Sequence, residues 1–141
     1  MPPTATITPV RENMVGHLDL RIITGIASVA FSGAFDNPDD WVRVSGSFLV
    51  GAPNKDKPIA YATIVVPSSF DVVDLKSGIP GWAVDASYSE YDDATQLIRV
   101  YVQLAVKNTN SEVLGVAFQV SLEYPYSPVT IVEVTQPLGA A

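Results

Sequence analysis

The chain has 141 residues, no cysteine and a formal net charge of −7 at pH 7, with 48% hydrophobic but only 16% charged residues. This length fits one domain that buries a core without crosslinks, and the lack of cysteine excludes disulfides and thiolate sites. The eight basic residues are scattered, and no apolar run reaches the roughly 18 residues of a membrane helix. We therefore expect neither nucleic acid nor membrane among its partners, since nucleic-acid binding needs a basic footprint.

Residues 1–16 are punctuated by Pro2, Pro3 and Pro9 and predict an extended N-terminal arm outside the core. Within this arm, residues 4–8 have the β-propensity to add a strand to the sheet of a neighbour. We expect residues 17–135 to form a single β-sandwich domain and residues 136–141 to form a C-terminal tail.

A long strand is expected at the start of the domain, over residues 17–31. Leu18, Leu20 and Ile22 occupy alternate positions, which is the period of a half-buried strand. The apolar positions change phase after Gly25, and this change predicts a bulge there.

A hairpin is expected next, from strands over residues 41–50 and 59–66 with a turn rich in Pro and Asn between them. The Ser-x-x-Asp spacing from Ser68 predicts a short helical turn over residues 69–75. A further strand is predicted over residues 82–89, with one face made of Trp82, Val84, Ala86 and Tyr88.

Two adjacent runs, residues 95–106 and 112–124, alternate most regularly and predict a long antiparallel hairpin. One face of each run is expected to enter the core, namely Ile98, Val100, Val102, Leu104 and Val106, and then Leu114, Val116, Phe118, Val120 and Leu122. The outward positions are partly apolar, since they include Tyr101, Ala105, Val113 and Ala117. A last strand is expected over residues 129–135.

Seven or eight strands at regular spacing, with almost no helix, predict an all-β fold. The expected architecture is an antiparallel β-sandwich of the jelly-roll or immunoglobulin-like type.

The sequence offers little for catalysis or for a cofactor. His17 is the only histidine, and no Gly-x-Ser-x-Gly elbow is present to supply a serine nucleophile beside it. One histidine without cysteine cannot provide the nitrogen and sulfur ligands of a zinc site. We therefore predict no enzyme activity, no catalytic residue and no cofactor.

Acidic loops supply the only metal candidates, because carboxylates are the ligands that calcium prefers. These weak candidates are Asp36, Asp39, Asp40, Asp92 and Asp93. Their spacing does not match an EF-hand, and Asp is also an ordinary residue of solvated turns, so we predict turn chemistry rather than a metal site.

The aromatic residues allow two interpretations. Trp41 and Trp82 begin predicted strands, where an indole ring typically closes the end of a sandwich core. The alternative is a sugar-stacking platform that these rings would form with Tyr88, Tyr91, Tyr124 and Tyr126.

A low charge fraction predicts that copies of the chain or a partner cover part of its surface. We expect a non-enzymatic virion structural protein, a bacteriophage capsid decoration (cement) or tail component, that assembles as a symmetric homo-oligomer on a larger protein lattice. Residues 129–135 and the N-terminal arm are expected to make the contacts. The expected interface residues are Thr4, Ile7, Val10, Tyr124, Tyr126 and Ile131.

Residues 1–6 lack the basic and apolar regions of a signal peptide, so the expected localisation is a virion assembled in the host cytoplasm. The alternative is an immunoglobulin-like or carbohydrate-binding module of a surface or secreted protein, which would use the loops at residues 36–40 and 90–94.

Overall fold

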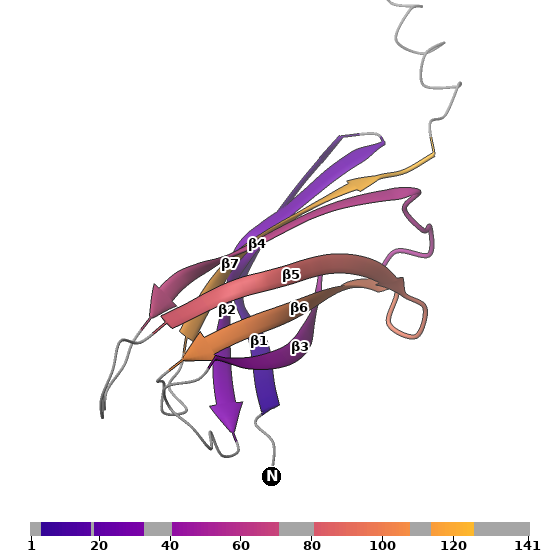
Figure 1. The fold of residues 1–141 in the computed structure, drawn as a ribbon. Helices are drawn as coiled ribbons and strands as arrows, with labels where there is room; N and C mark the ends of the chain where they lie inside the picture. The colour runs from indigo at the N-terminus through magenta and orange to yellow at the C-terminus, as the bar shows by residue number, and fades with distance from the viewer. Residues whose placement is uncertain (1–3, 18, 33–40, 71–80, 108–113, 126–141) are drawn as a thin grey trace, which may run out of the picture.

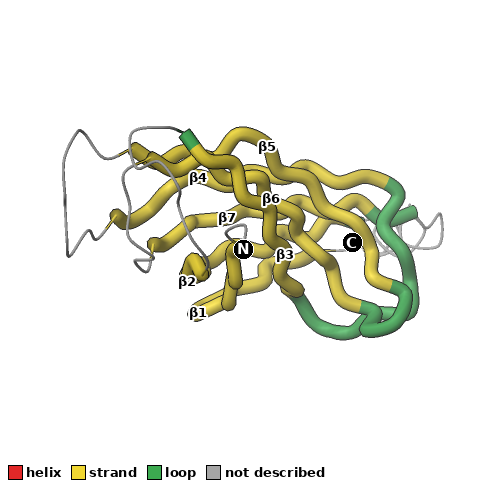
Figure 2. The backbone as a smooth tube through the Cα atoms, turned by 60° about the horizontal axis from the view of Figure 1, so that its bottom comes forward, coloured by secondary structure: helices red, strands yellow, loops and turns green. Residues whose placement is uncertain are grey.

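A computed structural model shows an antiparallel all-β protein (Figures 1 and 2). It describes residues 4–17, 19–32, 41–70, 81–107 and 114–125. This part of the chain contains no helix, and therefore none that could span a membrane. Its seven strands are β1 (Thr4–His17), β2 (Leu20–Ser32), β3 (Val42–Val50), β4 (Ala60–Phe70), β5 (Gly81–Asp92), β6 (Leu97–Lys107) and β7 (Leu114–Glu123).

The strands form two sheets that lie face to face like a sandwich. The four-stranded sheet has the order β1-β2-β7-β4 and the three-stranded sheet has the order β3-β6-β5. The two sheets also meet along their sides, where β1 contacts β3 and β4 contacts β5. The predicted all-β, sandwich-like fold is thus confirmed at this level.

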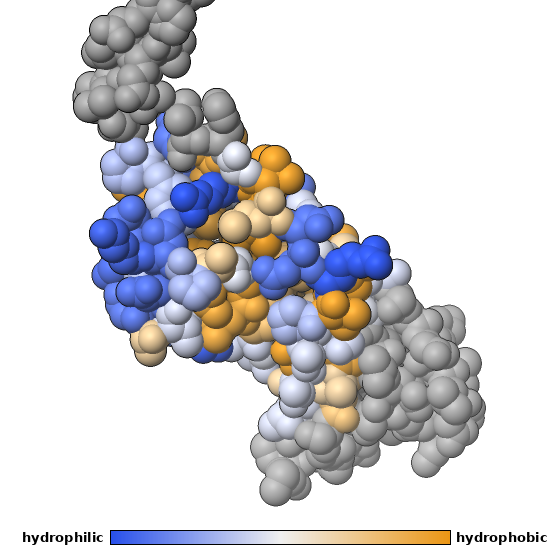
Figure 3. All heavy atoms as spheres, turned by 180° about the vertical axis from the view of Figure 1, so that it is seen from behind, coloured by the Kyte–Doolittle hydropathy of each residue, from blue (hydrophilic) through white to orange (hydrophobic). Residues whose placement is uncertain are grey.

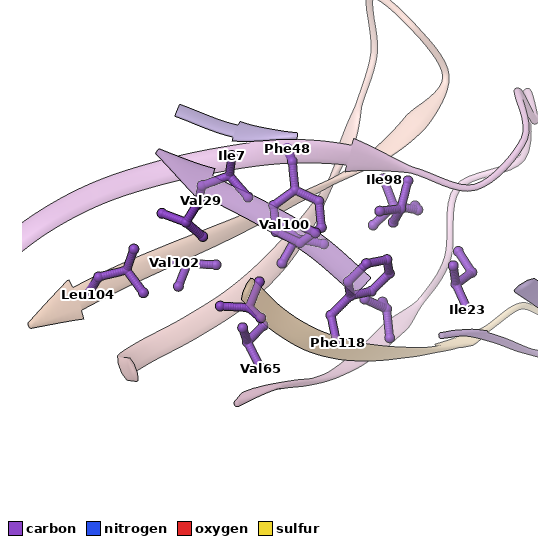
Figure 4. Packing of buried hydrophobic residues seen from close by; sticks show 14 of the residues in the cluster. Ile7, Ile23, Val29, Phe48, Val65, Ile98, Val100, Val102, Leu104 and Phe118 are labelled. Carbon is purple, nitrogen blue, oxygen red and sulfur yellow. The ribbon is translucent and has the colours of Figure 1, made fainter. Parts of the chain in front are cut away.

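The core lies between the two sheets (Figure 4). At its centre the ring of Phe48 on β3 meets the ring of Phe118 on β7 edge to face, with centroids 5.1 Å apart. The core faces predicted for β6 and β7 are confirmed, because the alternate apolar residues of both strands are buried. Only the side chain of Leu114 lies outside the described part of the structure.

The two predicted hairpins are wrong. β6 pairs with β3 and β5, whereas β7 pairs with β2 and β4 in the opposite sheet. β3 and β4 likewise belong to different sheets. Alternation fixes which face of a strand is buried, but it does not fix which strand lies beside it.

The N-terminal arm is not confirmed, because residues 4–17 form β1, an edge strand of the four-stranded sheet. β1 pairs with β2 along its whole length, and Ile7 is buried in the core. The register shifts between Pro9 and Arg11, so that Val10 is an extra residue. Proline is tolerated at an edge or a bulge because it has no N–H to donate.

Three edge strands contain such a register shift. The extra residue is Val10 in β1, Ser68 in β4 and Asp85 in β5. The shift in β5 corrects the predicted face of that strand, because an extra residue reverses the alternation beyond it. Trp82 and Val84 pack against the core, whereas Tyr88 lies exposed on the outside.

Gly25 does not mark a bulge, since β2 pairs with β7 without interruption. It instead allows a close approach of neighbouring groups. A Cβ atom at Gly25 would lie 2.1 Å from the carbonyl oxygen of Arg11 and 2.7 Å from the ring of Phe118. The nearest register shift belongs to β1, where Val10 lies opposite Ile26 and Ala27, while Gly25 itself pairs with Glu12.

Two other predictions meet the limits of the described residues. Positions 69 and 70 belong to β4, which contradicts the start of the predicted helical turn. The rest of that turn, the predicted strand at residues 129–135 and the tail at residues 136–141 lie outside the described residues.

Candidate interaction surface

The outer face of the four-stranded sheet carries exposed or half-buried apolar side chains from all four strands. They form what we call the outer apolar face, made of Val15, Leu20, Ile22, Ile26, Ile64, Val66 and Ala117. Val15 is 71% exposed and Ile64 is 57% exposed. Figure 3 views the molecule from this side and shows hydrophobic side chains at the surface.

The strand register explains why these residues gather. On β2, Ile23, Ala27 and Val29 enter the core. Because successive side chains of a strand point to opposite faces, the even-numbered positions of β2 point outward. The pairing then aligns outward residues across the sheet in three rows: Val15–Ile22–Ser121–Ala62, Asn13–Thr24–Gln119–Ile64 and Arg11–Ile26–Ala117–Val66. Of these positions only Arg11 is charged, and Glu123, which pairs with Leu20 at the end of the face, adds one negative charge, so the sheet face carries one charge of each sign in a chain of net charge −7.

One end of this face is hollowed. A depression of about 280 Å³ lies at the β1–β2 hairpin and is lined by Val15, Gly16, Asp19, Leu20 and Ile22. An exposed apolar patch with a recess is typical of a surface that another molecule covers. The geometry therefore suits contact with another molecule.

The acidic loop at residues 92–95 is a turn held together by hydrogen bonds between Asp92 and Thr95. The carboxylate of Asp92 accepts hydrogen bonds from the backbone N–H of Thr95 at 3.1 Å and from its hydroxyl at 2.5 Å. These bonds, led by that of the hydroxyl, lower the pKa of Asp92, with a smaller contribution from Arg99. Asp93 forms an ion pair with Lys57 at 2.9 Å.

Both carboxylates thus have local partners, as residues of solvated turns do. Within the described part of the chain, no group of three or more His, Cys, Asp or Glu side chains is placed to hold a metal ion. Asp36, Asp39 and Asp40 lie outside the described residues.

Those predicted interface residues that the structure describes lie at different places on the sheet. Thr4 and Tyr124 lie near opposite ends of β2, since Thr4 pairs with Ser32 and the N–H of Tyr124 donates to Asp19. Tyr124 also lies under the guanidinium of Arg21, 4.9 Å from the ring centroid. Ile7 is buried, Val10 is exposed at the bulge, and Tyr126 and Ile131 lie outside the described residues.

The two tryptophans have different environments. Trp82 packs against the core, as the sequence predicts. Trp41 precedes β3, is half exposed and lies over Gly81, where a Cβ atom would come within 2.6 Å of its ring.

Sequence reasoning found only part of the outer apolar face. It placed Ala117 on an outward, partly apolar surface, but it missed Ile22, Ile64 and Val66. The available clue was that β2 is apolar at both parities, which is typical of a strand that is covered on both faces.

No protein-family model, curated protein or solved structure matches this chain. Its function is therefore inferred from its own surfaces.

Proposed function

We propose that this protein is a non-enzymatic structural protein that assembles with copies of itself through the outer apolar face. The observation that supports the proposal is a sheet face with many exposed apolar side chains and only one charge of each sign, Arg11 and Glu123, in an acidic chain. Copies with net charge −7 repel one another, so the contact that brings them together is best made where charges are few and balanced.

The size of the face suits a second copy. The whole outer surface of this sheet, with four strands about 4.8 Å apart and each about 34 Å long as for ten residues of β7, covers on the order of 650 Å² before the relief of the side chains is counted. The outer apolar face, which spans positions 20 to 26 of β2, occupies on the order of 450 Å² of it. A standard interface buries about 800 Å² on each partner. Two such faces packed on a two-fold axis would cover one another.

We further propose that the assembly belongs to a virion, as a bacteriophage capsid decoration or tail component built in the host cytoplasm. The support is a short, cysteine-free, acidic β-sandwich with an apolar contact face. The proposal rests on analogy with a type of protein and not on sequence similarity, and it is tested by searching for the particle.

Of the two sandwich types predicted, we propose that the winding is closer to a jelly roll. In constant immunoglobulin domains the first, second, fifth and fourth strands share a sheet, whereas here β7 takes the place of the fifth strand. The chain also changes sheet at every connection from β2 to β5.

Assembly is tested by sedimentation velocity over a range of concentrations. We expect the wild type to be an oligomer and Ile64→Lys with Val66→Lys to sediment as a monomer of 15.1 kDa, because two buried lysines would lose their hydration at the contact. Gln103→Lys, on the outer face of the other sheet, is the matched control and should associate like the wild type. A monomeric wild type, or an oligomeric double variant, would contradict the proposal.

The virion role is tested by gradient sedimentation of an unfractionated lysate of the source, with this chain followed by peptide mass spectrometry. Co-migration with a particle of megadalton size is expected. Migration as a free oligomer would retain the self-assembly and refute the virion.

A further inference from the structure

A stacked pair of tyrosines stands on the outer face of the three-stranded sheet. Tyr88 on β5 pairs directly with Tyr101 on β6. Their ring centroids are 4.7 Å apart and their planes differ by 11°. Tyr88 is 54% exposed, so the pair forms an aromatic wall that reaches solvent.

The bulge in β5 is what places this wall outside. Val84 packs against the core, and regular alternation would turn position 88 to the same side. The extra residue Asp85 reverses the alternation, so that Ala86 and Tyr88 point outward. Bulges often re-aim a side chain next to a functional site.

A depression of about 270 Å³ lies beside the wall. The two tyrosines line it together with Ser45, Gly46, Ala86, Val102 and Gln103. The row next to the wall, Ser45–Gln103–Ala86, has a small residue on each side of the glutamine. The small side chains leave this space open.

Polar groups surround the apolar wall. The Gln103 amide and the Ser45 hydroxyl make no side-chain hydrogen bond to any other residue that the structure describes. One row further along, Arg43 on β3 reaches across β6 to Asp85 on β5 in an ion pair of 2.9 Å. The lining of the depression itself carries no charge.

We propose that this depression, which we call the tyrosine trough, binds one ring of a neutral saccharide. A pyranose ring presents a face of C–H groups, which suits the negative face of an aromatic ring. Its hydroxyl groups both donate and accept, and so match an amide, a hydroxyl and an ion pair at the rim. The volume is close to the lower limit of ligand sites, about 300 Å³, which fits one ring rather than a nucleotide or a larger cofactor.

The trough and the outer apolar face lie on opposite sheets, so the two proposals are independent. The lining of the trough includes none of residues 90–94, one of the two loops that the sequence suggested for a carbohydrate-binding module, and the other loop lies outside the described residues. An uncharged lining does not favour an anionic ligand such as a phosphate. A proline-rich peptide also stacks on aromatic rings, and the test below separates it from a saccharide.

The test uses the full chain and immobilised hexasaccharides of glucose, mannose, galactose and N-acetylglucosamine, followed by calorimetric titration with each soluble oligosaccharide that is retained. We expect at least one to bind. Tyr88→Ala should weaken its binding by about tenfold or more, as expected for the loss of an aromatic contact. Tyr88→Phe keeps the ring and should bind like the wild type.

Two further variants keep the result interpretable. Ala86→Leu fills the trough while both tyrosines are retained, and it should also weaken binding, even if Tyr88→Ala does not fold. Ile64→Lys, on the outer apolar face, should bind saccharide like the wild type. The proposal is wrong if no oligosaccharide binds at millimolar concentration, if binding survives both trough variants, or if only a proline-rich peptide binds in a Tyr88-dependent way.

Discussion

Gly25 shows how much a single missing methyl group decides in this fold. A Cβ atom there would lie 2.1 Å from a backbone carbonyl oxygen of β1, which cannot move without displacing its strand. We expect Gly25→Ala to destabilise the protein by about 3 kcal/mol through overpacking, measured as a lower midpoint in urea unfolding.

Gly16→Ala is the matched control on the neighbouring strand. A Cβ atom at Gly16 would meet the side chain of Arg21 and no backbone atom, 2.9 Å away at the Cγ atom, and a rotamer change of Arg21 relieves this contact while it moves the guanidinium away from Tyr124. The loss should be about 1 kcal/mol or less. Equal losses in the two variants would show that glycine is needed in these strands for another reason.

The sequence marked Gly25 as special but predicted the wrong cause. A glycine within a strand indicates either an irregular backbone or a close neighbour. Only the pairing of β1 with β2 and the position of the Phe118 ring distinguish these causes. Both contacts come from distant parts of the chain.

At the scale of elements, β4 and β5 join the two sheets along one side. The Thr63 hydroxyl on β4 lies 2.7 Å from the Ser89 hydroxyl on β5. Ser89 is the one polar residue found buried within the described chain, at 7% exposure. A buried hydroxyl needs such a partner, because burial without a hydrogen bond costs free energy.

We expect Thr63→Val to lower the free energy of unfolding by about 1–3 kcal/mol, because it leaves the Ser89 hydroxyl buried without its partner. Adding Ser89→Ala should restore part of this loss. The free energy of unfolding lost in the double variant should therefore be smaller than the sum of the losses in the two single variants. Urea unfolding of the three variants measures this difference. Strict additivity would mean that the two hydroxyl groups do not interact.

The elements themselves were largely predictable, and their neighbours were not. Period-two alternation gave the buried faces of β6 and β7 correctly, because burial acts on each strand separately. It failed for β5, where one extra residue at Asp85 reverses the faces. The predicted pairing of residues 95–106 with residues 112–124 was wrong as well, because a strand shows the same alternation beside any partner strand.

At the scale of the whole molecule, the net charge and the outer apolar face act in opposite directions. Repulsion between acidic copies weakens as salt screens it, while apolar contact does not depend on ion pairs. We therefore expect self-association to strengthen when sodium chloride rises from about 20 to 500 mM, since the Debye length falls several-fold over that range. Sedimentation equilibrium measures this change, and weaker association in salt would indicate an ionic contact instead.

Neither candidate surface was predicted as a whole from the sequence. The outer apolar face combines residues of four strands whose order in the sheet is not their order in the chain. The tyrosine trough depends on a bulge that leaves no clear mark in the sequence around Asp85. Individual residues such as Ala117 could be assigned to an outer surface, but the partners that complete each surface are brought in by the fold.

The irregular edges of the two sheets determine how copies of this molecule can grow into larger structures. Extra residues in three of the four edge strands, β1, β4 and β5, interrupt the straight ladder that a further strand would need to continue a sheet. The fourth edge strand, β3, is regular, but it lies beside β1 of the other sheet. Edge-to-edge stacking into amyloid-like fibrils is thereby disfavoured at these edges. The self-assembly that we propose would then grow through contacts between faces, which close into assemblies of limited size when they are related by a rotation axis.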